Sequence, residues 1–190
     1  MSKKKTEPTE YNTATMAALL EEKPKRGRPP DKVSRQNVYV ALRPDEKALL
    51  KELAGHLPDG LGRADLADLT ITILNARLEA LRRAVAGRNR EIPEGVTDMD
   101  SLYLLWDLPL PPKDVEDKWT SVRVSPQQVI ELGRAHGALN AAFGASRSQT
   151  FNLALSILAQ FLEHNPLAET NLTLAEVRGQ MMGSQGISYE

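Results

Sequence analysis

The chain has 190 residues and a formal net charge of −1 at pH 7, which allows one domain with tails and excludes a chain that is polybasic overall. It contains no cysteine, which excludes disulfides, cysteine-type zinc sites and thiol catalysis. No run of about 18 apolar residues occurs and the first residues lack the apolar segment of a secretory signal, so we expect a cytoplasmic protein without membrane contact.

Residues 1–33 are polar, charged and proline-bearing, so we expect a disordered basic arm. Its last part reads PKRGRPP over residues 24–30 and resembles an AT-hook, with a core of Arg26, Gly27, Arg28 and Pro29. In such a motif, glycine lets the backbone approach A·T-rich DNA while arginines enter the narrow minor groove. The alternative interpretation is a basic, solvated linker.

Residues 34–86 begin with a predicted strand, in which Val38, Val40 and Leu42 alternate with Asn37, Tyr39 and Ala41. Pro44 takes the favoured first position of a helix, and residues 58–60 (PDG) end it. A second helix begins near Arg63. Its apolar residues cover more than one face, so it should be buried on more than one side; they are Leu66, Ala67, Leu69, Ile71, Ile73, Leu74, Leu78, Leu81 and Val85.

Residues 87–117 form an acidic linker, in which Thr97 or Asp98 would cap a short helix that ends before three prolines. Residues 118–165 then repeat the earlier order. Val122 and Val124 alternate with polar residues in a strand, and Ser125 and Gln128 fit a capping box worth about 1 kcal/mol. We expect one helix to about Gly137, a second from Ser146 to Pro166, and a tail over 166–190 with a short helix near 173–182.

The two segments align as copies of one unit. Val40 and Val122, like Pro44 and Pro126, are 82 residues apart. After the turn, the spacing becomes 84, as between Arg63 and Arg147. A shift confined to a loop indicates an internal repeat.

A strand, a helix, a turn with GASRSQ (residues 144–149) and an apolar helix resemble the ribbon-helix-helix (Arc/MetJ/CopG-like) family of DNA-binding proteins. The resemblance implies that two units intertwine, share a helical core and insert an antiparallel β-ribbon into the major groove. Two copies in one chain resemble the tandem form of TraY-type relaxosome accessory proteins. We therefore expect a mainly α fold with one two-stranded antiparallel ribbon, arranged as a single-chain pseudo-dimer. Pairing of like copies in a homodimer remains the alternative.

The resemblance places base contacts on the outer face of the ribbon, at Asn37, Tyr39, Ala41, Ser121 and Arg123. Arg123 could bond both acceptors of guanine, worth roughly 1–3 kcal/mol of discrimination, and Asn37 could read adenine. The alternative is a solvated strand face. Trp119 is a further candidate for this face, but we expect it to pack against the linker.

The start of the second helix in each repeat should hold a DNA phosphate, because free amides and the helix dipole attract an anion. The residues concerned are Arg63, Ser146, Arg147 and Ser148. Asp65 would weaken the attraction in the first repeat, so we expect an asymmetric DNA site. Lys32, Arg35 and Lys118 would add positive charge near the strands, and the linker would lie away from the DNA.

We therefore expect sequence-specific binding of double-stranded DNA, by a transcriptional regulator or by a plasmid or mobile-element accessory factor in conjugation (relaxosome) or partition. The alternative is a protein-interaction adaptor that uses the linker or the C-terminal tail. No nucleophile–base pair, phosphate loop or metal-spaced cluster occurs, and the three histidines are scattered. We expect no enzyme activity, cofactor or metal.

Overall fold

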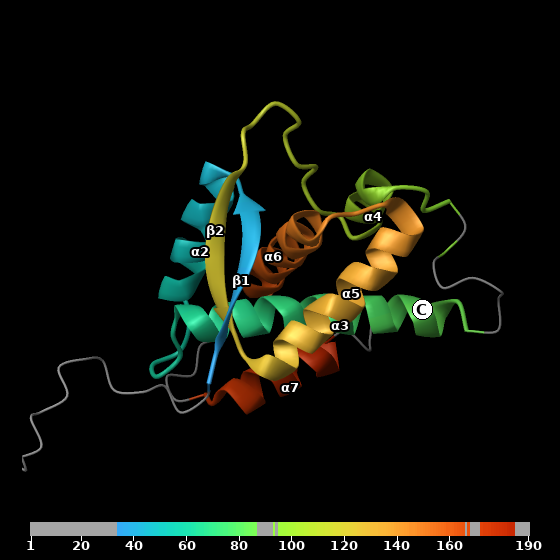
Figure 1. Cartoon of the computed structure of the whole chain (residues 1–190). Helices are drawn as coiled ribbons and strands as arrows, with labels where there is room; N and C mark the ends of the chain where they lie inside the picture. The colour runs from blue at the N-terminus through green and yellow to red at the C-terminus, as the bar shows by residue number, and fades with distance from the viewer. Residues whose placement is uncertain (1–33, 87–92, 94, 166, 168–171, 185–190) are drawn as a thin grey trace, which may run out of the picture. The chain divides into compact units, whose positions relative to one another are not determined.

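The computed structural model describes residues 34–86, 93, 95–165, 167 and 172–184. Over these residues, the chain is mainly helical with one two-stranded antiparallel sheet, as expected (Figure 1). The elements are β1 (Gln36–Leu42), α2 (Pro44–Gly55), α3 (Arg63–Ala84), α4 (Met99–Leu105), β2 (Lys118–Val124), α5 (Pro126–Phe143), α6 (Arg147–His164) and α7 (Leu174–Ser184). The predicted arm and its AT-hook-like motif at residues 26–29 lie outside the described residues.

The two strands come from the two sequence repeats and pair with each other. Val38 lies opposite Val122, and the register runs from Gln36 opposite Val124 to Leu42 opposite Lys118. Successive strand residues point to opposite faces, so the apolar positions of both strands turn inward. Val40, Leu42 and Val124 are completely buried there. The alternation in the sequence therefore predicted both strands and their inner face.

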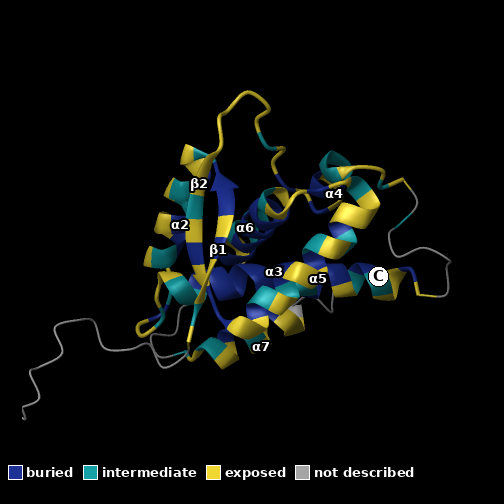
Figure 2. Cartoon of the chain, viewed as in Figure 1, coloured by how far each residue is buried: buried dark blue, intermediate teal, exposed yellow. Residues whose placement is uncertain are grey.

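The core lies between α3 and α6, which pack against each other; α3 also contacts β2, and α6 contacts β1. Both helices carry buried residues on several sides, and their central segments are dark blue in Figure 2. The prediction that the second helix of the first repeat is buried on more than one side is confirmed, and α6 of the second repeat is buried in the same way. None of the described helices is long and apolar enough to cross a membrane.

The linker contributes to this core. Asp98 caps α4, because its carboxylate accepts a hydrogen bond from the amide of Ser101 at 2.7 Å. Leu102, Tyr103 and Trp106 are buried. The capped short helix predicted in the linker is confirmed, and its apolar residues cover part of the core.

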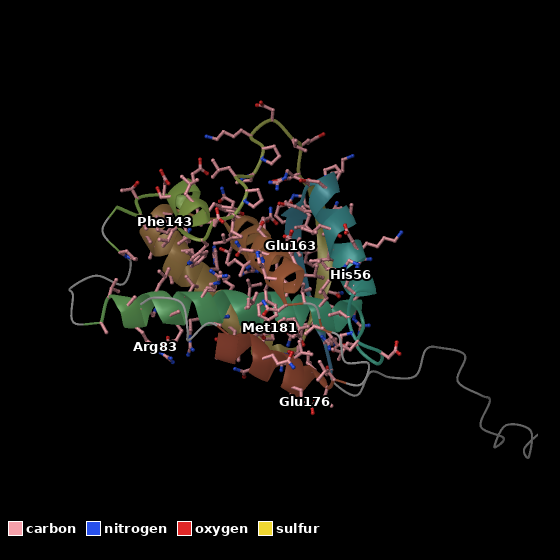
Figure 3. The ribbon with its side chains drawn as sticks, turned by 180° about the vertical axis from the view of Figure 1, so that it is seen from behind. His56, Arg83, Phe143, Glu163, Glu176 and Met181 are labelled. Atoms are coloured by element: carbon pink, nitrogen blue, oxygen red, sulfur yellow. The ribbon has the colours of Figure 1, made fainter. Side chains whose placement is uncertain are left out.

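The C-terminal helix α7 packs against α3, with Val177 and Met181 fully buried. Figure 3 shows Met181 where α7 meets α3. A short helix near residues 173–182 was predicted, and the structure confirms it.

Helix α5 is longer than predicted. The sequence suggested an end near Gly137, but the helix runs to Phe143 and ends at Gly144, whose φ of 69° is left-handed. A glycine inside a helix costs only about 1 kcal/mol. Burial of Leu139, two residues further on, outweighs this cost.

The capping box predicted at Ser125 and Gln128 is wrong. The Ser125 side chain makes no capping hydrogen bond, although Ser125 is the N-cap of α5. Its backbone amide instead donates to Asp68 at 2.9 Å. At the start of α5, the Ser125 amide is therefore bonded by Asp68 of the first repeat, in place of the expected Gln128 of the same helix.

Candidate nucleic-acid interface

The outer face of the ribbon consists of three cross-strand pairs. Asn37 lies opposite Arg123, Tyr39 opposite Ser121, and Ala41 opposite Trp119. Directly opposed residues of an antiparallel pair share one face. The structure therefore brings all five predicted base-contacting residues, from segments more than 75 residues apart in sequence, onto one face.

Most of this outer face is exposed to solvent. Tyr39 is 63% exposed, and Asn37, Ser121 and Arg123 are also exposed. Ala41 is the exception, since it is only 9% exposed. It offers a partner much less surface than its neighbours do.

Trp119 belongs to this face, and the prediction that it packs against the linker is wrong. The side chain is 74% exposed. The signal that could have placed it is the alternation of the strand, because Trp119 has the same parity as Ser121 and Arg123. Its size suggested burial, but its position on the strand determined its face.

Ser146, Arg147 and Ser148, which were predicted to contact a DNA phosphate, lie together at the start of α6. Arg147 is the first helical residue and is exposed. Ser146 forms a capping box with Gln149: its hydroxyl accepts from the Gln149 amide at 3.2 Å, and the Gln149 side chain accepts from the Ser146 amide at 2.8 Å. Ser146 therefore shapes the helix start, while Arg147 supplies the exposed positive charge.

Ser148 connects the helix start to the ribbon. Its hydroxyl accepts a hydrogen bond from the backbone amide of Ala41 at 2.8 Å. The predicted base-contacting and phosphate-contacting groups are therefore joined directly at this end of the ribbon. Ser148 has a positioning role that the sequence did not indicate, because its partner is 107 residues away.

The start of α3 is chemically different. Arg63 is its first residue and is exposed. Asp65 accepts from the Gly62 amide at 2.8 Å, so it caps the helix. Asp65 also pairs with the guanidinium of Arg35 at 2.5 Å.

Arg35 does not add exposed positive charge beside the ribbon, contrary to our expectation. Its side chain is only 6% exposed and pairs with both Asp65 and Asp68, the latter at 3.0 Å. Arg178 of α7 also pairs with Asp68, at 3.5 Å. Buried charges are expected to be paired in this way, so this network joins the residue directly before β1 to α3 and α7.

Glu46 at the start of α2 also forms an ion pair, with Arg43 three residues before it in the sequence. Its carboxylate accepts from the Arg43 amide at 2.8 Å and pairs with the Arg43 guanidinium at 2.6 Å. Burial is the main effect and raises the pKa of Glu46, although both contacts with Arg43 oppose it. Glu46 therefore caps the start of α2, and the Arg43 guanidinium holds its carboxylate in place.

Comparison of the chain with protein-family models, curated proteins and solved structures found no match. Within the described ranges, no group of three or more histidine, aspartate or glutamate residues could hold a metal ion.

Proposed function

We propose that this chain binds double-stranded DNA sequence-specifically, as a tandem ribbon-helix-helix protein whose ribbon enters the major groove. The observation that carries the proposal is the exposed outer face of the ribbon, on which Asn37, Tyr39, Ser121 and Arg123 lie in register. The major groove is about 12 Å wide and admits a two-stranded β-ribbon. Side chains of this kind can reach base edges there.

The strand register supports a single-chain pseudo-dimer. Tyr39 and Ser121 are equivalent positions of the two repeats, 82 residues apart, and they pair with each other. Val38 then pairs with Val122, the equivalent of Val40. Two equivalent strands related by a twofold axis between Tyr39 and Ser121 would pair in this register.

The chemistry of the face suits base readout. Arg123 can donate to two guanine acceptors, and Asn37 opposite it can bond adenine. Arg63 and Arg147 begin α3 and α6, where the positive end of the helix dipole favours a phosphate. The near-zero net charge of the chain is compatible with DNA binding only if positive charge is concentrated at such places.

Two biological roles are compatible with this activity. One is transcriptional regulation, and the other is an accessory role in plasmid transfer, partition or mobile-element processing. The tandem arrangement favours the accessory role by analogy with TraY-type proteins.

The experiment is selection of bound duplexes from a random DNA library, followed by affinity measurements on the selected site at several salt concentrations. Arg123→Gln should weaken binding by about 10-fold to 100-fold and relax preference for guanine at one position. Arg83→Gln is the matched control, because it removes the same charge from an exposed side chain at the far end of α3 (Figure 3). Equal effects of the two variants would contradict readout by Arg123.

A second candidate function is protein interaction through the linker. Leu104 is 65% exposed, and Leu105 and Leu110 are also exposed within an acidic segment. If the selection yields no duplex whose binding weakens with salt, the adaptor role becomes the better explanation.

A further inference from the structure

The two ends of the ribbon face differ in chemistry. Asn37 and Arg123 pair at one end, whereas Ala41 and Trp119 pair at the other. By the 82-residue spacing of the repeats, Asn37 is the equivalent of Trp119, and Ala41 is the equivalent of Arg123. The pseudo-twofold axis therefore relates a polar end to an apolar end.

We propose that Trp119 is a specificity-determining residue that contacts thymine methyl groups, so that the ribbon reads one half of its DNA site by apolar contact and the other by hydrogen bonds. This inference rests on the proposed DNA-binding function. It assigns a chemical role to each half of the asymmetric site.

The exposure of Trp119 is the first argument. An indole that is 74% exposed on a strand gains from losing contact with water. Its cross-strand partner Ala41 is small and nearly buried, so it provides no large side chain against which the indole could pack. The thymine methyl is the apolar group that the major groove presents.

The position of α6 is the second argument. The hydrogen bond from the Ala41 amide to Ser148 places the start of α6 beside the apolar end of the ribbon. Arg147, the neighbour of Ser148, is exposed at this helix start. A phosphate held there would keep the DNA backbone close to Trp119 without any hydrogen bond from the indole to a base.

The polar end has the corresponding neighbour on α3. Arg35, directly before β1, donates to the carbonyl of Ala64 at 2.7 Å, and the Ser125 amide directly after β2 donates to Asp68. The charged carboxylate of Asp65 caps α3, whereas the neutral side chain of Gln149 caps α6, so phosphate attraction is weaker at the start of α3. In this half of the DNA site, hydrogen bonds from Asn37 and Arg123 to base edges therefore contribute a larger share of the binding free energy.

The test replaces thymine by deoxyuridine in each half of the selected duplex separately, which removes only the methyl groups. The wild-type chain should lose about fourfold in affinity for each contacted methyl in one half and nothing in the other. Trp119→Ala should abolish this sensitivity, Trp119→Phe should keep part of it, and Arg123→Gln should keep all of it while losing guanine preference.

Two results would overturn the inference. One is an affinity of the wild-type chain that deoxyuridine does not change in either half, and the other is an unchanged deoxyuridine effect in Trp119→Ala. If guanine preference through Arg123 persists in that case, only the role of Trp119 fails. If no duplex is retained at low salt, the proposed function fails with it.

Discussion

The backbone amide of Ala41 donates a hydrogen bond to the hydroxyl of Ser148, with 2.8 Å between nitrogen and oxygen. Ala41 lies in β1 of the first repeat, and Ser148 lies in α6 of the second. A two-stranded ribbon has no third strand to pair the outward amides at its edges. This bond satisfies one such amide and fixes the start of α6 against the ribbon.

Ser148→Ala removes this acceptor and should lower the free energy of unfolding by about 1–3 kcal/mol, because the part-buried amide loses its partner. Urea denaturation followed by circular dichroism measures the change. Ser121→Ala is the matched control on the exposed face and should change stability by less than about 0.5 kcal/mol. Equal losses in the two variants would argue against a stabilising role of the Ala41–Ser148 bond.

Asp68→Ala should be far more destabilising, by about 3–5 kcal/mol, because it leaves the buried guanidinium of Arg35 with one partner fewer. It also removes the acceptor of the Ser125 amide, which ties the two repeats together.

Glu79→Ala is the control for Asp68→Ala, since the Glu79–Arg83 pair is exposed and should contribute less than about 1 kcal/mol. Chemical denaturation of both variants at one pH gives the comparison. A loss for Asp68→Ala as small as that for Glu79→Ala would show that the network does not hold the residue before β1 to α3 and α7.

The raised pKa of Glu46 predicts a specific dependence of stability on pH. The folded state binds the proton more tightly than the unfolded state, whose carboxyl titrates near 4.5. Stability should therefore fall as the pH rises from about 4.5 through the raised folded pKa, and this contribution should stay constant above it.

Glu46→Gln should remove that fall, and glutamine already occupies the equivalent position, Gln128, in the second repeat. The unfolding free energy of the variant relative to the wild-type chain should increase across this pH window. Glu79→Gln, on the exposed face of α3, serves as the control. If the unfolding free energy of Glu46→Gln relative to the wild-type chain stays constant or decreases as the pH rises, the raised pKa of Glu46 is contradicted.

Tryptophan fluorescence separates the two tryptophans of the chain, because Trp106 is buried and Trp119 is exposed. In Trp106→Phe, the remaining emission should be quenched strongly by iodide, and a selected duplex should protect it. In Trp119→Phe, iodide should quench weakly with or without DNA. Strong quenching of Trp119 in the presence of saturating duplex would place the indole outside the interface.

Local patterns in the sequence predicted the strands, the helix starts and the short helices, because alternation, proline and capping residues act over a few positions. They failed where the deciding partner is distant in sequence. Arg35 was expected at the surface and is held by Asp68, and Ser125 was expected to cap locally and bonds the same carboxylate. The position of Trp119, in contrast, depends on local sequence only, because the alternation of strand residues alone places it on the outer face.

The most direct test of the central claim is the mass of the protein–DNA complex, measured by light scattering on a duplex that carries one selected site. The pseudo-dimer predicts one chain of 21.0 kDa for each duplex and a site without twofold symmetry. Two chains on a symmetric site would contradict it, because like repeats would then pair between chains.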